Sequence, residues 1–335
     1  MTALPLTPIL PATVTDALTT AGLPVEHVLE VASRTLAEDL SWGPDVTSEA
    51  TLSSPTSAER ATSPTSAERA TSPTSAERAR NERVEATPTG TADVVARRSG
   101  TLAGVPVAAA VAYTLAAQQG VDLQVELIAA DGERIGPDGV ALTITGPLRC
   151  LLTAERSLLN LLGQLSGTAT ATAAWADALA GTPTRVRDTR KTVPGLRLLQ
   201  KYAVRCGGGV NHRMGLGDAA LIKDNHVAAA GSVAAAFAAV RRHDAQIPVE
   251  VECDTLAQVR EAIDAGAELV LLDNMSFDEL ADAVALCRPA GVRTEASGGL
   301  ELADAAAVGA TGVDYVAVGA LTHSAPVLDL GLDLR

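Results

Sequence analysis

The sequence predicts an α/β protein in two parts, a first domain with a half-covered sheet and a second domain built as a parallel sheet or an α/β barrel. Its 335 residues are enough for two domains, or for one barrel with an added layer. Apolar and polar residues alternate in the first part, whereas short apolar strands alternate with helical patterns in the second. Aromatic residues are only 2% of the chain, so Ala, Val and Leu must fill the core.

The first part is predicted to contain two helices and several strands. Apolar residues at helical spacing predict a helix over residues 24–40, which Gly43 and Pro44 interrupt. An Ala-rich run predicts a packed helix over 106–119. Strand patterns, two of them alternating as in an antiparallel sheet with one wet face, cover 91–105, 121–128 and 141–146.

A nine-residue unit rich in Ser, Thr, Pro, Ala, Glu and Arg occurs three times between Ser54 and Arg80. The unit has almost no apolar surface to bury, so it cannot compensate for the entropy lost on ordering. We therefore expect residues 54–80 to be a disordered, solvent-exposed insert. The alternative is a regulatory or partner-binding segment.

A strongly apolar helix is predicted over residues 151–181, with leucines on more than one face. Glu155 and Arg156 lie near its start. The simplest interpretation is a buried connecting helix, but a helix this apolar also suits packing against several elements, including another subunit.

Six short strands are predicted in the second part, and each ends in polar or small residues. Because the carboxyl ends of the strands form the functional rim of α/β barrels, these residues mark the candidate site. The strands are expected at 185–189, 220–224, 249–253, 269–273, 292–297 and 315–319.

Charge is distributed unevenly along the chain. The formal net charge is −14 and the pI is about 4.8, which disfavours binding to nucleic acid or to an anionic membrane. Yet all three lysines lie between residues 185 and 226, together with six arginines. A basic cluster in an acidic protein predicts a small, highly charged ligand.

The four cysteines, the N-terminus and the hydropathy pattern indicate the compartment. The cysteines are far apart and have no metal-binding spacing, so we expect reduced, mostly buried thiols. Residues 1–14 contain several prolines and no basic region, unlike a signal peptide, and no apolar run is long enough to span a membrane. A soluble cytoplasmic protein is expected.

Glu252 and Asp273 end consecutive predicted strands after apolar runs. Two carboxylates at one rim can hold Mg²⁺, with waters and phosphate oxygens completing its shell. The alternative is a salt bridge to an Arg or Lys of the same rim. Glu250 shares a strand face with Glu252, so one of the two could be structural.

Small residues follow the last two predicted strands, at 297–300 and 318–324. Backbone N–H groups in such loops can hold a phosphate group, and barrels often use their last loops in this way. The glycines at 207–209 and 215–217 do not follow a strand with dinucleotide-binding spacing, so a Rossmann fingerprint is rejected.

The chain closely resembles the quinolinate phosphoribosyltransferase family over nearly its whole length, apart from the repeats. The resemblance is carried by residues 155–170, 188–226, 249–252, 271–274, 297–300 and 313–324. It implies a type II phosphoribosyltransferase with an N-terminal open-faced α/β sandwich, an incomplete α/β barrel of six to seven strands, and a homodimer with shared sites. The expected boundaries are 1–150 for the sandwich, 151–325 for the barrel and 326–335 for a tail returning to the sandwich.

The resemblance also implies roles for individual residues. Quinolinate carboxylates would be bound by Arg190, His212 and Arg213, with Arg156 from the partner subunit. Lys191 and Lys223 would serve catalysis on the pyrophosphate and ribose side, and Glu252 and Asp273 would bind the ribose hydroxyls and Mg²⁺. The remaining substrate-binding positions are Thr189, Ser297, Gly298, Gly299, Gly319, Ala320 and His323. Lys201 is left as a charge on a helix surface or behind the site.

The implied reaction joins quinolinate to phosphoribosyl pyrophosphate, with loss of pyrophosphate and CO₂, to give nicotinate mononucleotide for NAD biosynthesis. A related enzyme with another acidic acceptor, such as the paralogue associated with molybdenum transport, is the first alternative. A Schiff-base aldolase using Lys191 or Lys223 is the second, and a non-catalytic nucleotide sensor is the third.

Overall fold

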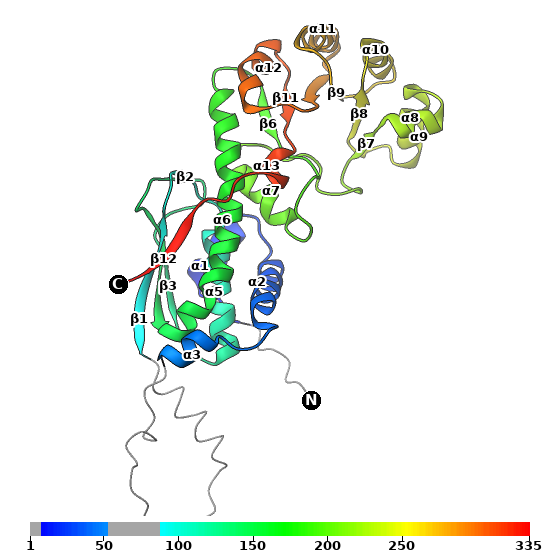
Figure 1. The fold of residues 1–335 in the computed structure, drawn as a ribbon. Helices are drawn as coiled ribbons and strands as arrows, with labels where there is room; N and C mark the ends of the chain where they lie inside the picture. The colour runs from blue at the N-terminus through cyan, green and yellow to red at the C-terminus, as the bar shows by residue number, and fades with distance from the viewer. Residues whose placement is uncertain (1–7, 53–87) are drawn as a thin grey trace, which may run out of the picture.

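The computed structural model describes residues 8–52 and 88–335, which form two parts, each built on its own sheet (Figure 1). The repeats at 54–80, and the expectation that they are disordered, lie outside the described residues. The long helix α6 (Leu148–Ala178) runs from the first part into the second.

The other elements have the following bounds. The remaining helices are α1 (Ala12–Thr20), α2 (Val25–Leu40), α3 (Val46–Leu52), α5 (Val105–Gln119), α7 (Arg197–Cys206), α8 (Asp224–Ala230), α9 (Val233–His243), α10 (Leu256–Asp264), α11 (Phe277–Cys287), α12 (Ala305–Thr311) and α13 (Ala320–His323), with 3-10 turns η2 (Arg288–Ala290) and η3 (Leu302–Asp304). The strands are β1 (Thr89–Ala96), β2 (Gly100–Thr101), β3 (Gln124–Leu127), β4 (Arg134–Ile135), β5 (Val140–Pro147), β6 (Arg185–Arg187), β7 (Ala220–Ile222), β8 (Val249–Cys253), β9 (Leu269–Asp273), β10 (Arg293–Ser297), β11 (Tyr315–Ala317) and β12 (Leu330–Leu334).

The first part is an open-faced α/β sandwich. Its antiparallel sheet has the order β12-β1-β5-β3, and a small second sheet pairs β2 with β4. One face buries Val94, Leu142 and Ile144 in a core shared with α5 and α6. The other face carries polar side chains, and the Thr143 hydroxyl donates to Asp93 over 2.6 Å. The alternation of apolar and polar residues in the sequence therefore places the two kinds of side chain on opposite faces of the sheet.

The segment before β12 crosses α6 closely. Gly167 of α6 lies so near this segment that a Cβ there would be 2.1 Å from the Pro326 carbonyl oxygen. The chain then enters the sandwich, where β12 pairs with β1 in antiparallel register (Figure 1). Elements from opposite ends of the described chain therefore complete one sheet.

The second part is an incomplete α/β barrel. Its six strands are parallel and have the order β6-β11-β10-β9-β8-β7. Val210 adds a parallel bridge to Arg187 beyond β6, in the position of a seventh strand. The strands bury Val186, Val251 and Val270 against the surrounding helices. Parallel strands with helical crossovers put all carboxyl ends on one rim.

Most sequence-predicted elements of the barrel are present. β8 and β9 have the predicted bounds, whereas β6, β7 and β11 are each three residues long because their last predicted residues belong to the rim. The sequence did not predict α1 or α3, and α3 begins only two residues after Pro44. All four cysteines are free. Among the described residues, no helix is long and apolar enough to cross a membrane.

Candidate functional site

Two arginines, Arg190 and Arg213, lie close together at the rim. Arg190 follows β6, and Arg213 precedes β7. Burial and the nearby positive charge of Arg190 lower the pKa of Arg213. Both guanidinium groups have a buried Nε that finds no hydrogen-bond acceptor among the described residues. Since buried donors are normally satisfied, this pair is suited to a bound anion.

His212 is buried, and both of its ring nitrogens are engaged by the protein. Its Nδ1 accepts a 2.8 Å hydrogen bond from the Arg213 backbone N–H, so Nδ1 carries no proton. Nε2 must therefore carry the proton, and it donates to Glu250 over 2.6 Å. In this conformation His212 orients the backbone of Arg213, and it would have to release Glu250 for Nε2 to contact a carboxylate.

Beneath His212 lies a buried acidic pair. The Glu295 carboxylate has no exposed surface, contacts Arg187, and has one oxygen 3.7 Å from His212 Nε2. Burial, followed by the charge of Glu250, raises the pKa of Glu295 to about 8. His212, Glu250 and Glu295 have the spacing of metal ligands. However, Arg187 already supplies positive charge to Glu295, and the His212 N–H already occupies Glu250, so this set is better explained as a hydrogen-bond network.

Lys201 is not a surface charge, which corrects the first part of the sequence-based expectation. It is completely buried on α7, where its ammonium contacts the equally buried Asp188 and donates to the His212 carbonyl oxygen over 2.8 Å. Asp188 also accepts from the Asn211 side chain at 2.5 Å and from the His212 backbone N–H at 2.9 Å. A charge this deeply buried requires such partners. Lys201 therefore lies behind the rim and connects its segments.

Glu252 and Asp273 lie at the ends of neighbouring parallel strands, as the sequence predicted. Glu252 accepts from the Lys223 ammonium at 2.5 Å, which is the rim salt bridge that had been the alternative to a metal-ligand role. Asp273 accepts from the Asn274 side chain at 2.6 Å. Each carboxylate keeps a second oxygen, Glu252 Oε1 or Asp273 Oδ1, for which no hydrogen bond is recorded among the described residues.

The loops after β9 and β10 meet at the rim. Gly298 has a φ of +105°, and a Cβ there would lie 2.3 Å from the Asn274 side-chain oxygen, so only glycine fits. Ser297 accepts from the Asn274 backbone N–H at 2.9 Å, and Gly299 follows with a φ of +60°. The loop after β10 is thus held directly against the loop that carries Asp273.

The turn after β11 lies against the segment that carries Lys191. A Cβ added at Gly319 would lie 3.1 Å from the Lys191 side chain and 3.2 Å from His323 Nε2. The Thr322 hydroxyl donates to the Lys191 carbonyl oxygen over 2.9 Å. Ala320 begins α13, and its side chain is exposed. On the other side of Lys191, the Thr189 hydroxyl accepts from the Lys191 backbone N–H at 3.0 Å. The basic segment and the small-residue loop are therefore joined.

Arg156 is the predicted site residue for which no contact with the rim is recorded. Its side chain is 65% exposed on α6, with Glu155 as its recorded ion-pair partner at 3.6 Å. Nearby turns of α6 hold the 41–44 loop, because Thr153 donates to Asp45 and Ser157 donates to Asp39. Arg156 is thus presented on the surface of the sandwich.

Comparison with known proteins connects this geometry to a family. A model described as "Quinolinate phosphoribosyl transferase, N-terminal domain" matches residues 45–166, and one described as "Quinolinate phosphoribosyl transferase, C-terminal domain" matches residues 168–333. The chain belongs to the quinolinate phosphoribosyltransferase family. The resemblance noted in the sequence is therefore confirmed.

Relatives of known function and structure cover most of this family member. The nicotinate-nucleotide pyrophosphorylase [carboxylating] of Mycobacterium leprae is 46% identical over 304 residues, which are 90% of this chain and 95% of that protein. The human protein of the same name is 39% identical, over 71% of this chain and 80% of its own. The structure of the nicotinate-nucleotide pyrophosphorylase from Francisella tularensis is 33% identical and superimposes with a TM-score of 0.77, covering 93% of this chain and 98% of that one.

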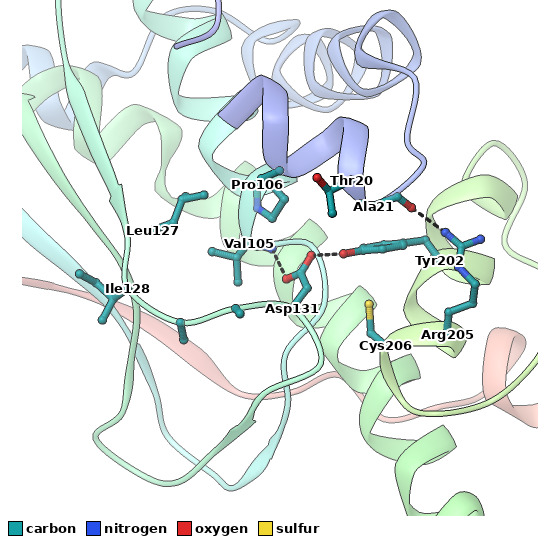
Figure 2. A pocket seen from close by; sticks show the side chains of 13 residues that line it. Thr20, Ala21, Val105, Pro106, Leu127, Ile128, Asp131, Tyr202, Arg205 and Cys206 are labelled. Carbon is teal, nitrogen blue, oxygen red and sulfur yellow. Dashed lines mark hydrogen bonds between the residues drawn. The ribbon is translucent and has the colours of Figure 1, made fainter. Parts of the chain in front are cut away.

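A cavity of about 640 Å³ lies between the sandwich and α7 (Figure 2). None of the residues that line it is a predicted site residue. The Tyr202 hydroxyl donates to the buried Asp131 carboxylate over 2.7 Å, and the Val105 backbone N–H donates to it over 2.9 Å. Arg205 donates to the Ala21 carbonyl oxygen over 2.7 Å. These contacts fasten α7 to the first domain.

Sequence reasoning missed the buried residues that hold the rim together. Asp188 and Glu295 were recognised only as polar residues at strand ends, and Asn211 was not singled out. The indication lies in the structure of α7, where six consecutive residues from Leu199 to Val204 are buried. A helix buried on all faces that contains a lysine implies a partner for the charge.

Proposed function

We propose that this chain transfers the phosphoribosyl group of phosphoribosyl pyrophosphate to quinolinate and releases pyrophosphate and CO₂, as a carboxylating nicotinate-nucleotide pyrophosphorylase in NAD biosynthesis. The observation that carries the proposal is the pair of rim guanidinium groups, Arg190 and Arg213, each with an unsatisfied buried donor. An anion with two adjacent carboxylates matches two adjacent guanidinium groups. The relatives reported above carry this activity in their names, which favours quinolinate over another acidic acceptor.

The acceptor half of the site would use Arg190 and Arg213 for the quinolinate carboxylates. Thr189 precedes Arg190, and His212 precedes and orients Arg213. Fixing the two guanidinium groups before the substrate arrives lowers the entropic cost of positioning it. The pyridine nitrogen is already a nucleophile, so the acceptor needs no general base.

The donor half would use the loops after β10 and β11 for the 5′-phosphate. Backbone N–H groups of Ser297, Gly298 and Gly299, with Gly319 and Ala320, are suited to phosphate oxygens. His323 and Lys191 adjoin Gly319, so a positive charge lies beside this cradle. Lys191 would act on the departing pyrophosphate from there.

Mg²⁺ fits the carboxylates at the ends of β8 and β9. Glu252 and Asp273 each keep an oxygen without a recorded partner among the described residues, and both are only partly buried. Hard oxygen ligands together with phosphate oxygens are the set that Mg²⁺ prefers. When bound, the ion would neutralise charge on the pyrophosphate. Lys223, now paired with Glu252, would share its charge with the donor.

The chemistry then follows from charge stabilisation at fixed positions. The bond from the anomeric carbon to pyrophosphate breaks as the pyridine nitrogen bonds to that carbon, and Lys191 and Lys223 stabilise the negative charge that leaves. The quaternised nitrogen then withdraws electrons from the ring, so the adjacent carboxylate leaves as CO₂ and the carbanion takes a proton. The chain's own task is to hold two anions that repel each other.

We further propose that the chain acts as a homodimer in which Arg156 completes the site of the partner. Arg156 is exposed on the sandwich, beside a loop whose Trp42 is 94% exposed, and Val46 at the start of α3 is 69% exposed. Large apolar side chains next to an exposed arginine are typical of protein interfaces. The Schiff-base alternative has less support, because the pairing of Lys223 with Glu252 stabilises the charged amine rather than the nucleophilic one.

The experiment that tests the function is quinolinate consumption by the purified protein, followed by ultraviolet absorbance. We expect consumption only when phosphoribosyl pyrophosphate and Mg²⁺ are both present, with stoichiometric release of CO₂ and nicotinate mononucleotide. Omission of each component in turn provides the controls. Turnover of another acidic acceptor in place of quinolinate would refute the assignment.

A further inference from the structure

The buried ion pair between Lys201 and Asp188 occupies a central position behind the rim. Neither side chain has any exposed surface. The Lys201 ammonium contacts Asp188 and donates to the His212 carbonyl oxygen over 2.8 Å, while Asp188 accepts from Asn211 and from the His212 backbone N–H. Three groups of the 211–212 segment therefore converge on two charges that come from two other segments.

This arrangement fixes two parts of the rim relative to each other. Arg190 lies two residues after Asp188, and Arg213 lies one residue after His212. The Asp188 carboxylate and the Lys201 ammonium hold both the N–H and the C=O of His212, so the 211–213 segment cannot shift without breaking three hydrogen bonds. The connection therefore holds the backbone next to each of the two arginines.

Stability alone does not explain the pair. Two charges removed from water cost several kcal/mol each, and well-packed apolar residues often replace such pairs with no loss of stability. Van der Waals packing could fill the same space, whereas only charged, directional groups define where the His212 backbone lies. The pair is therefore better explained by its effect on the geometry of the rim.

We propose that Lys201 is a positioning residue for acceptor recognition, acting through Asp188 and the His212 backbone to set the spacing of Arg190 and Arg213. This inference rests on the proposed function and adds to it a residue that does not touch the substrate. The preceding residue of the same helix offers a matched comparison. Gln200 is also fully buried, but it accepts from the Val193 N–H at 2.8 Å and donates to the Thr322 carbonyl oxygen over 2.6 Å.

Gln200 therefore supports the donor half and Lys201 the acceptor half. Thr322 donates to the Lys191 carbonyl oxygen, so Gln200 acts on the segment beside the phosphate cradle. Two neighbouring buried polar residues of α7 should consequently affect different substrates. A general structural role would affect both substrates alike.

The test compares steady-state kinetics of Lys201→Met, Gln200→Leu and the double variant Lys201→Met/Asp188→Leu. For Lys201→Met we expect kcat/KM for quinolinate to fall by about 10- to 100-fold, since misplacement by about 1 Å can have an effect of that size. The KM for phosphoribosyl pyrophosphate should stay within about twofold of wild type. Gln200→Leu should show the opposite selectivity, with the larger rise in the KM for phosphoribosyl pyrophosphate.

The double variant separates positioning from stability, because it removes both charges and leaves no unpaired one. We expect its thermal midpoint to approach that of wild type while the defect toward quinolinate persists. A double variant with wild-type stability and a wild-type KM for quinolinate would overturn the inference. Should the double variant not fold, the isosteric Asp188→Asn is measured instead, and it should show the same rise in the KM for quinolinate. A wild-type protein without quinolinate turnover would instead contradict the proposed function.

Discussion

Lys223 illustrates how a single exposed charge at the rim can matter to turnover without supporting the fold. Its ammonium is 47% exposed and pairs with Glu252, whose side chain is 11% exposed, so the substitution leaves one rim carboxylate without its cation. We expect Lys223→Ala to lower kcat by roughly 10²-fold, the scale of losing one positioned charge in a transition state. Kinetics of the purified variant provide the measurement.

The control for this substitution is Arg242→Ala, which removes a positive charge from the exposed surface of α9, away from the rim. Arg242→Ala should keep the thermal midpoint of wild type, because an exposed charge contributes little to stability. Lys223→Ala should lower it only slightly, because one partner of its ion pair is half exposed. Near-normal turnover of Lys223→Ala would remove Lys223 from the mechanism.

Glu295 gives the stability of the fold a defined pH dependence. Its pKa is raised from 4.5 to about 8 by burial and by Glu250. Between these values the folded protein keeps a proton that the unfolded chain has released, so the free energy of unfolding falls as pH rises from about 4.5 to about 8. Glu295→Gln should remove this contribution, so the free energy of unfolding should fall less steeply with pH over this range.

Thermal midpoints measured between pH 5 and pH 9 check this prediction, with Glu38→Gln on the exposed surface of α2 as the carboxylate control. The difference between Glu295→Gln and wild type is the informative quantity, because groups that do not interact with Glu295 titrate equally in both. Parallel curves would show that Glu295 is already ionised throughout this range.

At the scale of residues, the sequence indicated which residues belong to the site, but it did not indicate which of them contact each other. Arg190 and Arg213 lie together as expected from a basic cluster. Lys201 was misjudged because lysine is rarely buried, and the local sequence does not reveal that Asp188 lies opposite it. Likewise the engagement of both His212 nitrogens depends on Glu250, which is distant in sequence.

Helix α6 depends on close approach of the segment that precedes β12. A Cβ on Gly167 would lie 2.1 Å from the Pro326 carbonyl oxygen, which belongs to backbone and cannot rotate away. Gly167→Ala should therefore destabilise the protein by about 1–3 kcal/mol, the usual cost of overpacking, even though alanine favours helix. Chemical denaturation measures the change.

Gly136→Ala is the matched control, because nothing lies within 4 Å of a Cβ added there and its φ is not in the left-handed region. Its free energy of unfolding should stay close to that of wild type. Equal stability of the two variants would show that the crossing of α6 tolerates a larger spacing.

At the scale of elements, the barrel could be predicted more fully than the sandwich. β9 is an apolar run that ends in Asp273, and β8 alternates Val with Glu before Cys253, so a local pattern indicates both strands and their bounds. Helices α1 and α3 are short and follow prolines, so their periodicity was too brief to recognise. The pairing of β12 with β1 is a long-range contact that periodicity cannot indicate.

At the scale of the whole molecule, the proposed dimer predicts complementation between inactive variants. Arg156→Ala and Lys223→Ala would each inactivate every site of their homodimers. In a mixed dimer, one site combines an intact Lys223 with an intact Arg156 of the partner. Co-expression should therefore restore about a quarter of wild-type activity for random pairing of a C2 dimer.

Activity of the separately tagged, tandem-purified mixed dimer, expected at about half of wild type because one of its two sites is intact, provides the measurement. Mixing two separately purified Arg156→Ala preparations is the control. Absence of rescue in a verified mixed dimer would indicate that each site lies within one subunit. Rescue would support Arg156 as the contribution of the partner.

The return of β12 to the first sheet has a consequence for synthesis on the ribosome. β1 ends at Ala96 and finds one of its two neighbours only at Leu330, so residues 97–329 must emerge before that edge is covered. Until then an unpaired strand edge is open to wrong partners, including the same strand of another nascent chain. The sheet of the sandwich therefore cannot be completed until the whole barrel, which lies between β1 and β12 in the sequence, has been synthesised.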